Sequence, residues 1–189
     1  MSVWSRVCDR LDPLFATLHA WDERAMEAFS GAQALRKLYR LFVAATYLGD
    51  GYVWAALATG LAVFGTTADR WNVVVGFGVT VANLVLVRLL KMAVSRERPE
   101  ADGEGFRGRV IDTFSFPSGH ATTSFGLAYL VAVRYPHPAV QAAVCLGATT
   151  IALSRVYLRE HYFLDIAGGA VLGTLVAASL LPLFHWLVF

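Results

Sequence analysis

Residues 71–90, "WNVVVGFGVTVANLVLVRLL", contain a single charged side chain in a run of apolar ones. A helix needs roughly 20 mostly apolar residues to cross the hydrocarbon core of a bilayer. Trp71 stands at the edge of this run, where an interfacial anchor is expected. The stretch therefore predicts a membrane-spanning helix.

Four further segments have the same character. The 120–133 and 138–153 segments are short, so their ends must extend into the polar motifs beside them. Small residues such as Gly169 and Gly173 recur within the spans and allow close helix packing in lipid. We therefore expect an all-α, polytopic membrane helix bundle of about five spans, with six possible. The four further segments are 47–68, 120–133, 138–153 and 166–189.

Composition supports a membrane protein. The chain has 189 residues, of which 57% are hydrophobic and 16% are charged, and its mean hydropathy is +0.53. In soluble domains about a quarter of the residues are charged. The two cysteines, Cys8 and Cys145, give no disulfide framework. No Cys/His cluster has metal-ligand spacing, so we expect no metal and no cofactor, and we expect no nucleic-acid partner.

The first 46 residues differ from the rest. Leu11, Leu14, Phe15 and Leu18 share one helical face, and the charge density excludes a spanning helix. The beginning mixes acids with bases and lacks an apolar core, so it is no secretory signal. We predict an amphipathic membrane-surface segment over 1–46 and a transmembrane domain over 47–189.

Three polar groups lie at the ends of predicted spans. An ionisable residue inside a membrane protein is a functional hypothesis by default. If five spans alternate in direction, all three groups fall on the same side of the membrane. Lysine and arginine also snorkel at helix ends, which is the interpretation we favour for Arg96, Arg107 and Arg109. The groups are Lys91 with Arg98; Ser118, Gly119 and His120; and Arg155, His161 and Asp165.

Together these residues describe an oxyanion site. Lys91 and Arg98 are seven residues apart, so two helical turns place them on one face. A helix start after a glycine-containing turn offers unpaired N–H donors, and arginine matches phosphate oxygens. His161 and Asp165, at i and i+4 on a helix, can hydrogen-bond so that the carboxylate orients the imidazole. The chemistry indicated is phosphoryl transfer through a phosphohistidine, without a metal.

The motifs match those of a known family. "KMAVSRERP" fits K-x6-R-P, "PSGH" fits a second motif, and "SRVYLREHYFLD" fits S-R-x5-H-x3-D. In their order and spacing they resemble the type 2 phosphatidic acid phosphatase superfamily, over residues 47–189. Many bacterial members have six spans, whereas five are predicted here.

The resemblance implies roles for these residues. His161 would be the nucleophile, Asp165 its orienting partner, and His120 the proton donor to the leaving oxygen. The phosphate would be held by Lys91, Arg98, Ser118, Gly119 and Arg155. Family substrates are lipid phosphates and diphosphates such as phosphatidate, phosphatidylglycerol phosphate and undecaprenyl diphosphate, and the three motifs do not distinguish a monophosphate from a diphosphate.

Two alternative functions stay open at this point. One is a phosphatase for a soluble phosphate ester, with the membrane serving only to localise it. The other is a non-catalytic protein that binds or transports anionic lipids. The second alternative does not require His161, Asp165 and His120 together. Oligomeric state is not encoded in these motifs.

The location of the site is predicted from charge. Thirteen of the lysines and arginines fall on the predicted site side and two on the other. We therefore expect a multi-pass protein of the plasma membrane with a cytoplasmic site, although most family members face the opposite side. Arg159 and Glu160 stand where small or apolar residues are common in the family, and we expect them to pair with each other in solvent rather than to shape the headgroup entrance.

Overall fold

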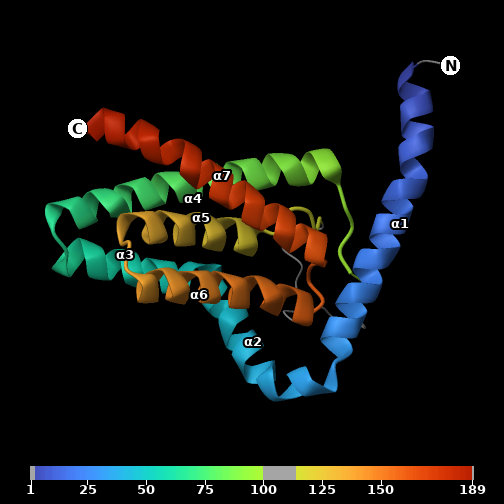
Figure 1. Ribbon diagram of the computed structural model, residues 1–189, viewed down its shortest axis with the longest axis horizontal. Coiled ribbons are helices and arrows are strands. Elements are labelled where there is room, and N and C mark those ends of the chain that lie inside the picture. Colours follow the sequence, from blue (N-terminus) through green and yellow to red (C-terminus); the bar gives the residue numbers. More distant parts are fainter. Residues whose placement is uncertain (1–2, 100–113, 189) are drawn as a thin grey trace.

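The computed structural model describes residues 3–99 and 114–188, with side chains for residues 13–99 and 114–183. Every regular element in these residues is a helix, as the sequence predicted (Figure 1). The elements are α1 (Val3–Gly31), the 3-10 helix η1 (Gln33–Leu38), α2 (Tyr39–Tyr47), the π-helical turn η2 (Leu48–Tyr52), α3 (Val53–Phe64), α4 (Thr67–Val94), α5 (Gly119–Arg134), α6 (Pro138–Tyr157) and α7 (Phe163–Val188).

Among the described residues, four helical segments are long and apolar enough to cross a membrane. They are 33–64, 67–94, 138–157 and 163–183. In the first of these, η1, α2, η2 and α3 follow one another as a continuous helical segment, so the helix that contains the predicted 47–68 span begins before residue 47. Large apolar side chains face outward, as in Phe77, which is 71% exposed, and Leu146, which is 68% exposed. A bundle with this surface suits lipid rather than water.

Helix α5 is the central helix of the bundle. It packs against α4, α6 and α7 and has 16 residues, which corresponds to a length of about 24 Å. This is shorter than the roughly 30 Å hydrocarbon core, so α5 does not satisfy the length criterion for a span. The sequence-based prediction that this segment is short and continues into its polar motif is confirmed, because the helix begins at Gly119, within "PSGH".

Glycines allow α5 and α7 to make backbone contact. A Cβ atom on Gly169 would lie 2.7 Å from the Ser118 carbonyl oxygen, and one on Gly173 would collide with the Thr122 carbonyl group. A Cβ on Gly126 would lie 2.9 Å from the Gly173 oxygen. The predicted close packing through Gly169 and Gly173 is thus confirmed, and it fixes the start of α5 against the start of α7.

The helix ends are set by local sequence. Helix α4 begins with a capping box in which the Asp69 carboxylate accepts from the Thr66 backbone N–H at 2.7 Å. It ends at Ser95, whose φ of 51° is left-handed. At α6, Pro138 occupies the first turn, where its missing N–H costs nothing.

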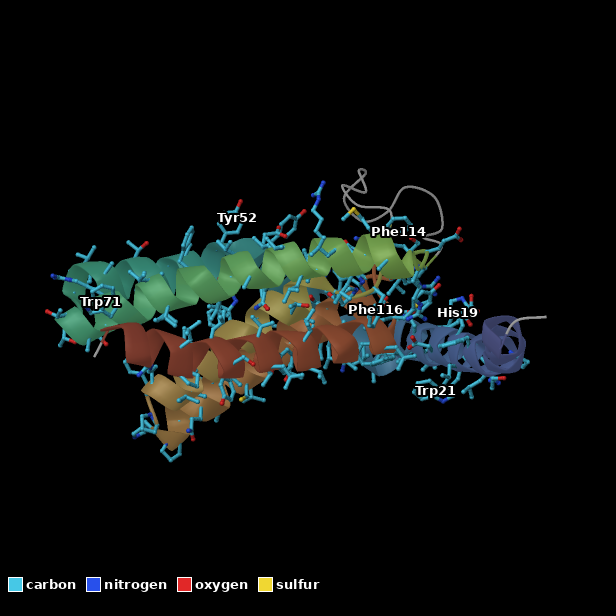
Figure 2. All side chains as sticks on the ribbon, turned by 90° about the horizontal axis from the view of Figure 1, so that it is seen from above. His19, Trp21, Tyr52, Trp71, Phe114 and Phe116 are labelled. Atoms are coloured by element: carbon cyan, nitrogen blue, oxygen red, sulfur yellow. The ribbon has the colours of Figure 1, made fainter. Side chains whose placement is uncertain are left out.

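The chain runs up and down along one axis, with α1 placed apart. Figure 1 shows the α3–α4 and α5–α6 connections at one end of the bundle. At the other end lie the end of α4, the start of α5 and the α6–α7 connection, and α1 runs across this end. Trp71 marks the first end, and His19, Trp21, Phe114 and Phe116 mark the second (Figure 2).

Candidate active site

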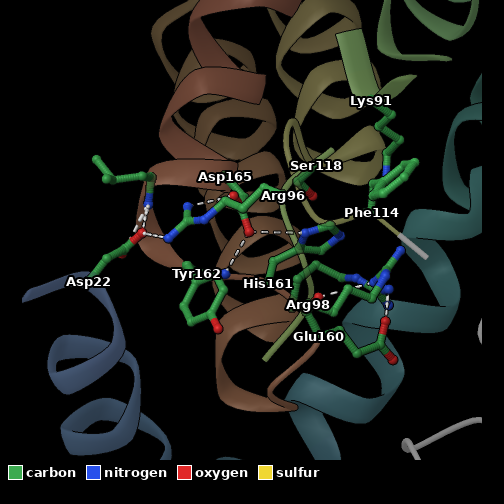
Figure 3. A network of polar contacts seen from close by, with 12 residues as sticks. Asp22, Lys91, Arg96, Arg98, Phe114, Ser118, Glu160, His161, Tyr162 and Asp165 are labelled. Atoms are coloured by element: carbon green, nitrogen blue, oxygen red, sulfur yellow. Dashed lines mark hydrogen bonds and ion pairs between the residues drawn. The ribbon is translucent and has the colours of Figure 1, made fainter. Parts of the chain in front are cut away.

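The three polar groups meet at the end of the bundle beside α1 (Figure 3). The Ser118 backbone N–H donates to the Asp165 carbonyl oxygen at 3.1 Å. The Arg98 guanidinium donates to the Glu160 carbonyl oxygen at 3.0 Å. Segments far apart in the chain are therefore in direct contact here, as the predicted convergence of the three groups requires.

His161 and Asp165 form the buried centre of the site. The two side chains are 2% and 0% exposed, and 3.5 Å separates His161 Nδ1 from Asp165 Oδ2. That distance is at the long end for a hydrogen bond, and Nδ1 has no hydrogen bond of ordinary geometry within the described residues. The same carboxylate oxygen accepts from the Tyr162 backbone N–H at 2.8 Å.

The prediction that His161 and Asp165 lie at i and i+4 of one helix was wrong. His161 lies in the turn before α7, and only Asp165 is in the first turn of that helix. The pair still meets, because the Tyr162 N–H is bonded to the carboxylate and folds the turn back over the helix start.

Burial keeps the His161 ring neutral. Its pKa is lowered from 6.5 to about 3, first by loss of hydration and further by the Arg98 and Arg155 charges, against the opposing effect of Asp165. A neutral imidazole has a nitrogen lone pair available for attack. Nδ1 is the ring nitrogen that faces Asp165, and Nε2 is the other one.

Two of the predicted phosphate-binding cations, Arg98 and Arg155, act electrostatically on this histidine. Lys91, at the end of α4, is 6% exposed and donates to the Phe114 carbonyl oxygen at 2.5 Å. Arg155, 5% exposed, donates to Thr46 Oγ1 at 3.0 Å and forms an ion pair with Glu160.

Arg98 does not share a helical face with Lys91, contrary to the sequence-based expectation. The left-handed Ser95 ends α4, and the chain continues as an irregular segment to Arg98. This segment forms an isolated bridge between Glu97 and Phe114, which returns the chain toward the "PSGH" turn. Arg98 is therefore positioned by the irregular segment that follows Ser95, and not by helix α4.

The start of α5 offers the predicted donors. Ser118 is the N-cap residue, and its hydroxyl oxygen is buried with no hydrogen-bond partner among the described residues. Gly119 is the first helical residue, so its N–H belongs to the unpaired first turn. A buried hydroxyl and a helix N-terminus near three cations are groups that can bind an anion.

His120 lies one residue further and contacts a residue that the sequence analysis did not single out. Its Nε2 is 2.9 Å from Asp50 Oδ1. Asp50 projects from the π-helical turn η2, where Gly51 has a φ of 109° that favours glycine. Gly49 leaves the room for the ring, since a Cβ there would lie 2.8 Å from His120 Cδ2. An acid within a predicted apolar span was the signal for Asp50.

Arg96 and Asp22, which lie outside the predicted site, form a chain of ion pairs that ends on Asp165. Arg96 is bonded to Asp165 at 2.8 Å and to Asp22, in α1, at 2.9 Å. The expectation that Arg96 snorkels at a helix end was therefore wrong, because its guanidinium points inward. Arg107 and Arg109 lie outside the described residues.

Arg159 and Glu160 do not pair with each other as expected. Glu160 pairs with Arg155, while Arg159 donates from Nε to Ser30 Oγ at 3.1 Å. The reason is local: Arg159 has a left-handed φ of 55°, which separates the directions of the two side chains.

The sequence and the fold are similar to those of known proteins. The family model described as the PAP2 superfamily matches residues 71–189. A decaprenylphosphoryl-5-phosphoribose phosphatase of Mycobacterium tuberculosis is 35% identical over 127 residues, which cover 66% of this chain and 68% of that protein.

Two solved structures share the fold. The crystal structure of Aquifex aeolicus LpxE has a TM-score of 0.72 and 25% identity, over 84% of this chain and 93% of its own. A transmembrane PAP2 type phosphatidylglycerolphosphate phosphatase from Bacillus subtilis has a TM-score of 0.71 and 24% identity, over 92% of this chain and 88% of its own.

Proposed function

The chain belongs to the PAP2 superfamily, and from that premise we propose that it is an integral membrane phosphatase that hydrolyses a lipid phosphomonoester or diphosphate through a phosphohistidine at His161, without a metal ion. The observation that carries the proposal is the buried, neutral His161 between Asp165 and the Arg98 and Arg155 guanidinium groups. A histidine that only stabilised the fold would not need this charge arrangement.

The first step transfers the phosphoryl group to the enzyme. His161 Nε2 attacks phosphorus, and the bond from phosphorus to the lipid oxygen breaks. His120 donates a proton to that oxygen, so the lipid leaves as a neutral alcohol or, from a diphosphate, as a monophosphate. Asp165 stabilises the positive charge that forms on the imidazole ring.

The second step releases phosphate. The deprotonated His120 accepts a proton from water, whose oxygen attacks phosphorus while the N–P bond breaks, which regenerates neutral His161 and protonated His120. In both steps Lys91, Arg98 and Arg155 bind the equatorial phosphate oxygens, together with the Ser118 hydroxyl and the Gly119 N–H. Such preorganised charge is usually the largest contribution to catalysis.

A lipid is the substrate class that the surroundings of the site favour. The related mycobacterial protein is named for a decaprenyl-linked substrate. An apolar groove along α7 reaches Phe116, next to the "PSGH" turn. Its lining is Leu90, Phe116, Leu164, Ala167, Gly168, Val171, Leu172 and Leu175.

The reaction is tested by phosphate release from purified protein. Phosphatidate, phosphatidylglycerol phosphate and undecaprenyl diphosphate are assayed in parallel with wild type and His161→Ala. We expect release from at least one lipid by wild type only, and an acid-labile phosphoprotein when wild type is quenched during turnover. Equal release by His161→Ala rules out the phosphohistidine, and no release from any lipid by wild type rules out the lipid phosphatase.

The groove distinguishes a lipid substrate from a soluble ester. Val171 is 60% exposed on the groove, so Val171→Trp obstructs a chain lying there. The matched control is Leu146→Trp, at a similarly exposed position on α6. We expect Val171→Trp to raise KM for the long-chain lipid but not for a water-soluble ester such as glycerol phosphate. Equal KM values for the lipid in both variants contradict this use of the groove.

We place the protein in the plasma membrane with its site on the cytoplasmic side, from the distribution of charge. Lys37 and Arg70 are exposed on the two predicted sides. In a background with Cys8→Ser and Cys145→Ser, an impermeant maleimide applied to intact cells should label Arg70→Cys and not Lys37→Cys. The reverse labelling overturns the cytoplasmic assignment.

A further inference from the structure

A chain of four ionisable side chains links α1 to the catalytic histidine (Figure 3). Asp22 Oδ2 lies 2.9 Å from the Arg96 guanidinium, whose other terminal nitrogen lies 2.8 Å from Asp165 Oδ1. Asp165 Oδ2 then faces His161 Nδ1 at 3.5 Å. The three PAP2 motifs explain the presence of Asp165 and His161 but not of Asp22.

Asp22 is a fully buried carboxylate, at 0% exposure. Burying a charge is costly unless it is paired and hydrogen-bonded. Besides Arg96, Asp22 accepts from the Leu164 backbone N–H at 3.2 and 3.3 Å. That N–H belongs to the first turn of α7, where such groups have no partner within the helix. Asp22 therefore caps, from another helix, the turn that carries Asp165.

Arg96 is held in one orientation from several sides. Its planar guanidinium bridges Asp22 and Asp165, and it also contacts His19 Nδ1 at 3.1 Å. Its central carbon lies 4.2 Å from the centroid of the Tyr162 ring, a cation–π distance. Lysine, with a point charge, cannot reproduce this two-sided bridge.

Because Arg96 binds one oxygen of the Asp165 carboxylate, the two oxygens have different partners. Oδ1 is bound to Arg96, and Oδ2 is left to face His161 and the Tyr162 N–H. The charges of Asp22, Arg96 and Asp165 sum to one negative charge. That remaining charge is what stabilises the cationic ring formed when His161 is phosphorylated, whereas without Asp22 the sum would be zero.

We propose that Arg96 and Asp22 are positioning residues, which hold Asp165 in register with His161 and make the N-terminal helix α1 part of the working active site. This proposal rests on the proposed phosphatase function. Neither residue touches the phosphate. Both act through Asp165, so their loss changes the rate of phosphoryl transfer and leaves substrate binding unchanged.

The test compares Asp22→Asn, Arg96→Lys and Arg96→Gln with Glu27→Gln. Glu27 is exposed on the same helix, one turn after Glu23, and provides the matched control. Partners that orient a metal-bound histidine cost about 10- to 100-fold when removed, and we expect roughly a 10-fold or larger fall in kcat with KM within about twofold. Glu27→Gln should match wild type in both.

A double variant distinguishes residues that position Asp165 from residues that only hold α1 against the bundle. If both residues act along one path, Asp22→Asn combined with Arg96→Gln loses no more kcat than Arg96→Gln alone. Rapid-quench measurement of the acid-labile phosphoprotein should show slower formation in each variant. A structural attachment would instead change the thermal midpoint in detergent and leave the rate of phosphoprotein formation in the folded fraction unchanged.

Failure of the positioning proposal can be distinguished from failure of the proposed phosphatase function. Wild type that forms no phosphoprotein and releases no phosphate contradicts the phosphatase, whatever the variants do. An active wild type with kcat unaltered in Asp22→Asn and Arg96→Gln overturns the positioning proposal alone, as does a raised KM at constant kcat. Should Asp22→Asn not fold, Arg96→Lys decides, because Arg96 has a partly exposed side chain, at 17%.

Discussion

Replacing His161 with asparagine should remove a large part of the acid sensitivity of folding. The pKa of His161 is lowered from 6.5 to about 3, mainly by burial. On unfolding, the ring regains its ordinary pKa, so between these pH values the unfolded state binds more protons than the folded state. Stability therefore rises with pH across this window, and it is lost as the pH falls from about 6.5 toward 3.

The shift gives the size of the effect. A difference of about 3.5 pH units corresponds to about 5 kcal/mol over the whole window. Lowering the pH from 7 to 5 should cost wild type about 2 kcal/mol through this one group. In His161→Asn that contribution is absent, because the amide does not titrate in this range.

Equilibrium unfolding in mixed detergent micelles, followed by tryptophan fluorescence at these two pH values, measures the difference. His137→Asn serves as control, since His137 is an exposed histidine in the α5–α6 connection. We expect the control to lose stability like wild type, and His161→Asn to lose about 2 kcal/mol less. An equal loss in all three proteins would refute the reasoning that burial holds the imidazole neutral.

Three further predictions concern packing, metals and the proton donor. Gly173→Ala drives a methyl group into the Thr122 carbonyl and should cost about 1–3 kcal/mol in the same unfolding measurement, whereas Gly147→Ala, with open space around it, should not. Phosphate release should persist in excess EDTA, and a loss that added Mg²⁺ restores would contradict the metal-free mechanism. Asp50→Asn, which removes the carboxylate charge beside His120, should lower kcat for a lipid phosphate more than for p-nitrophenyl phosphate, whose leaving group needs no proton; an equal effect on both would show that Asp50 does not act through His120.

The bundle and the meeting of its polar groups were predictable from span order. Because apolar runs alternate with charged connections, counting the runs placed all three motifs at one end, and the contact between Ser118 and Asp165 confirms it. The ends of the helices were harder to predict from the sequence. Nothing in "KMAVSRERP" signals that Ser95 turns left-handed, so Arg98 was wrongly placed on the helix.

The outer part of the site was not predictable in the same way. Asp22 stands beside Glu23 on an amphipathic helix, and sequence alone does not say which acid turns inward. Arg96 lies among the unspecified positions of its motif, where a snorkelling side chain is the ordinary expectation. Their pairing depends on where α1 lies against the bundle, which is a tertiary contact between residues 74 positions apart. Asp50 did carry a readable signal, as an acid inside an apolar run.

The direct backbone contact between α5 and α7 has a consequence for how substrate enters. Because the Ser118, Thr122 and Gly173 carbonyl groups lie within 3 Å of where a Cβ atom on Gly169, Gly173 or Gly126 would be, these two helices have little room for a side-chain layer that could be repacked, and we expect them to move as one rigid body. His120, the proposed proton donor, is on α5, and His161, the proposed nucleophile, lies in the turn directly before α7, so we expect their separation to stay nearly constant during turnover. We therefore expect any opening that admits a lipid headgroup to come from α1, α4, α6 or the α2–α3 segment, moving against α5 and α7.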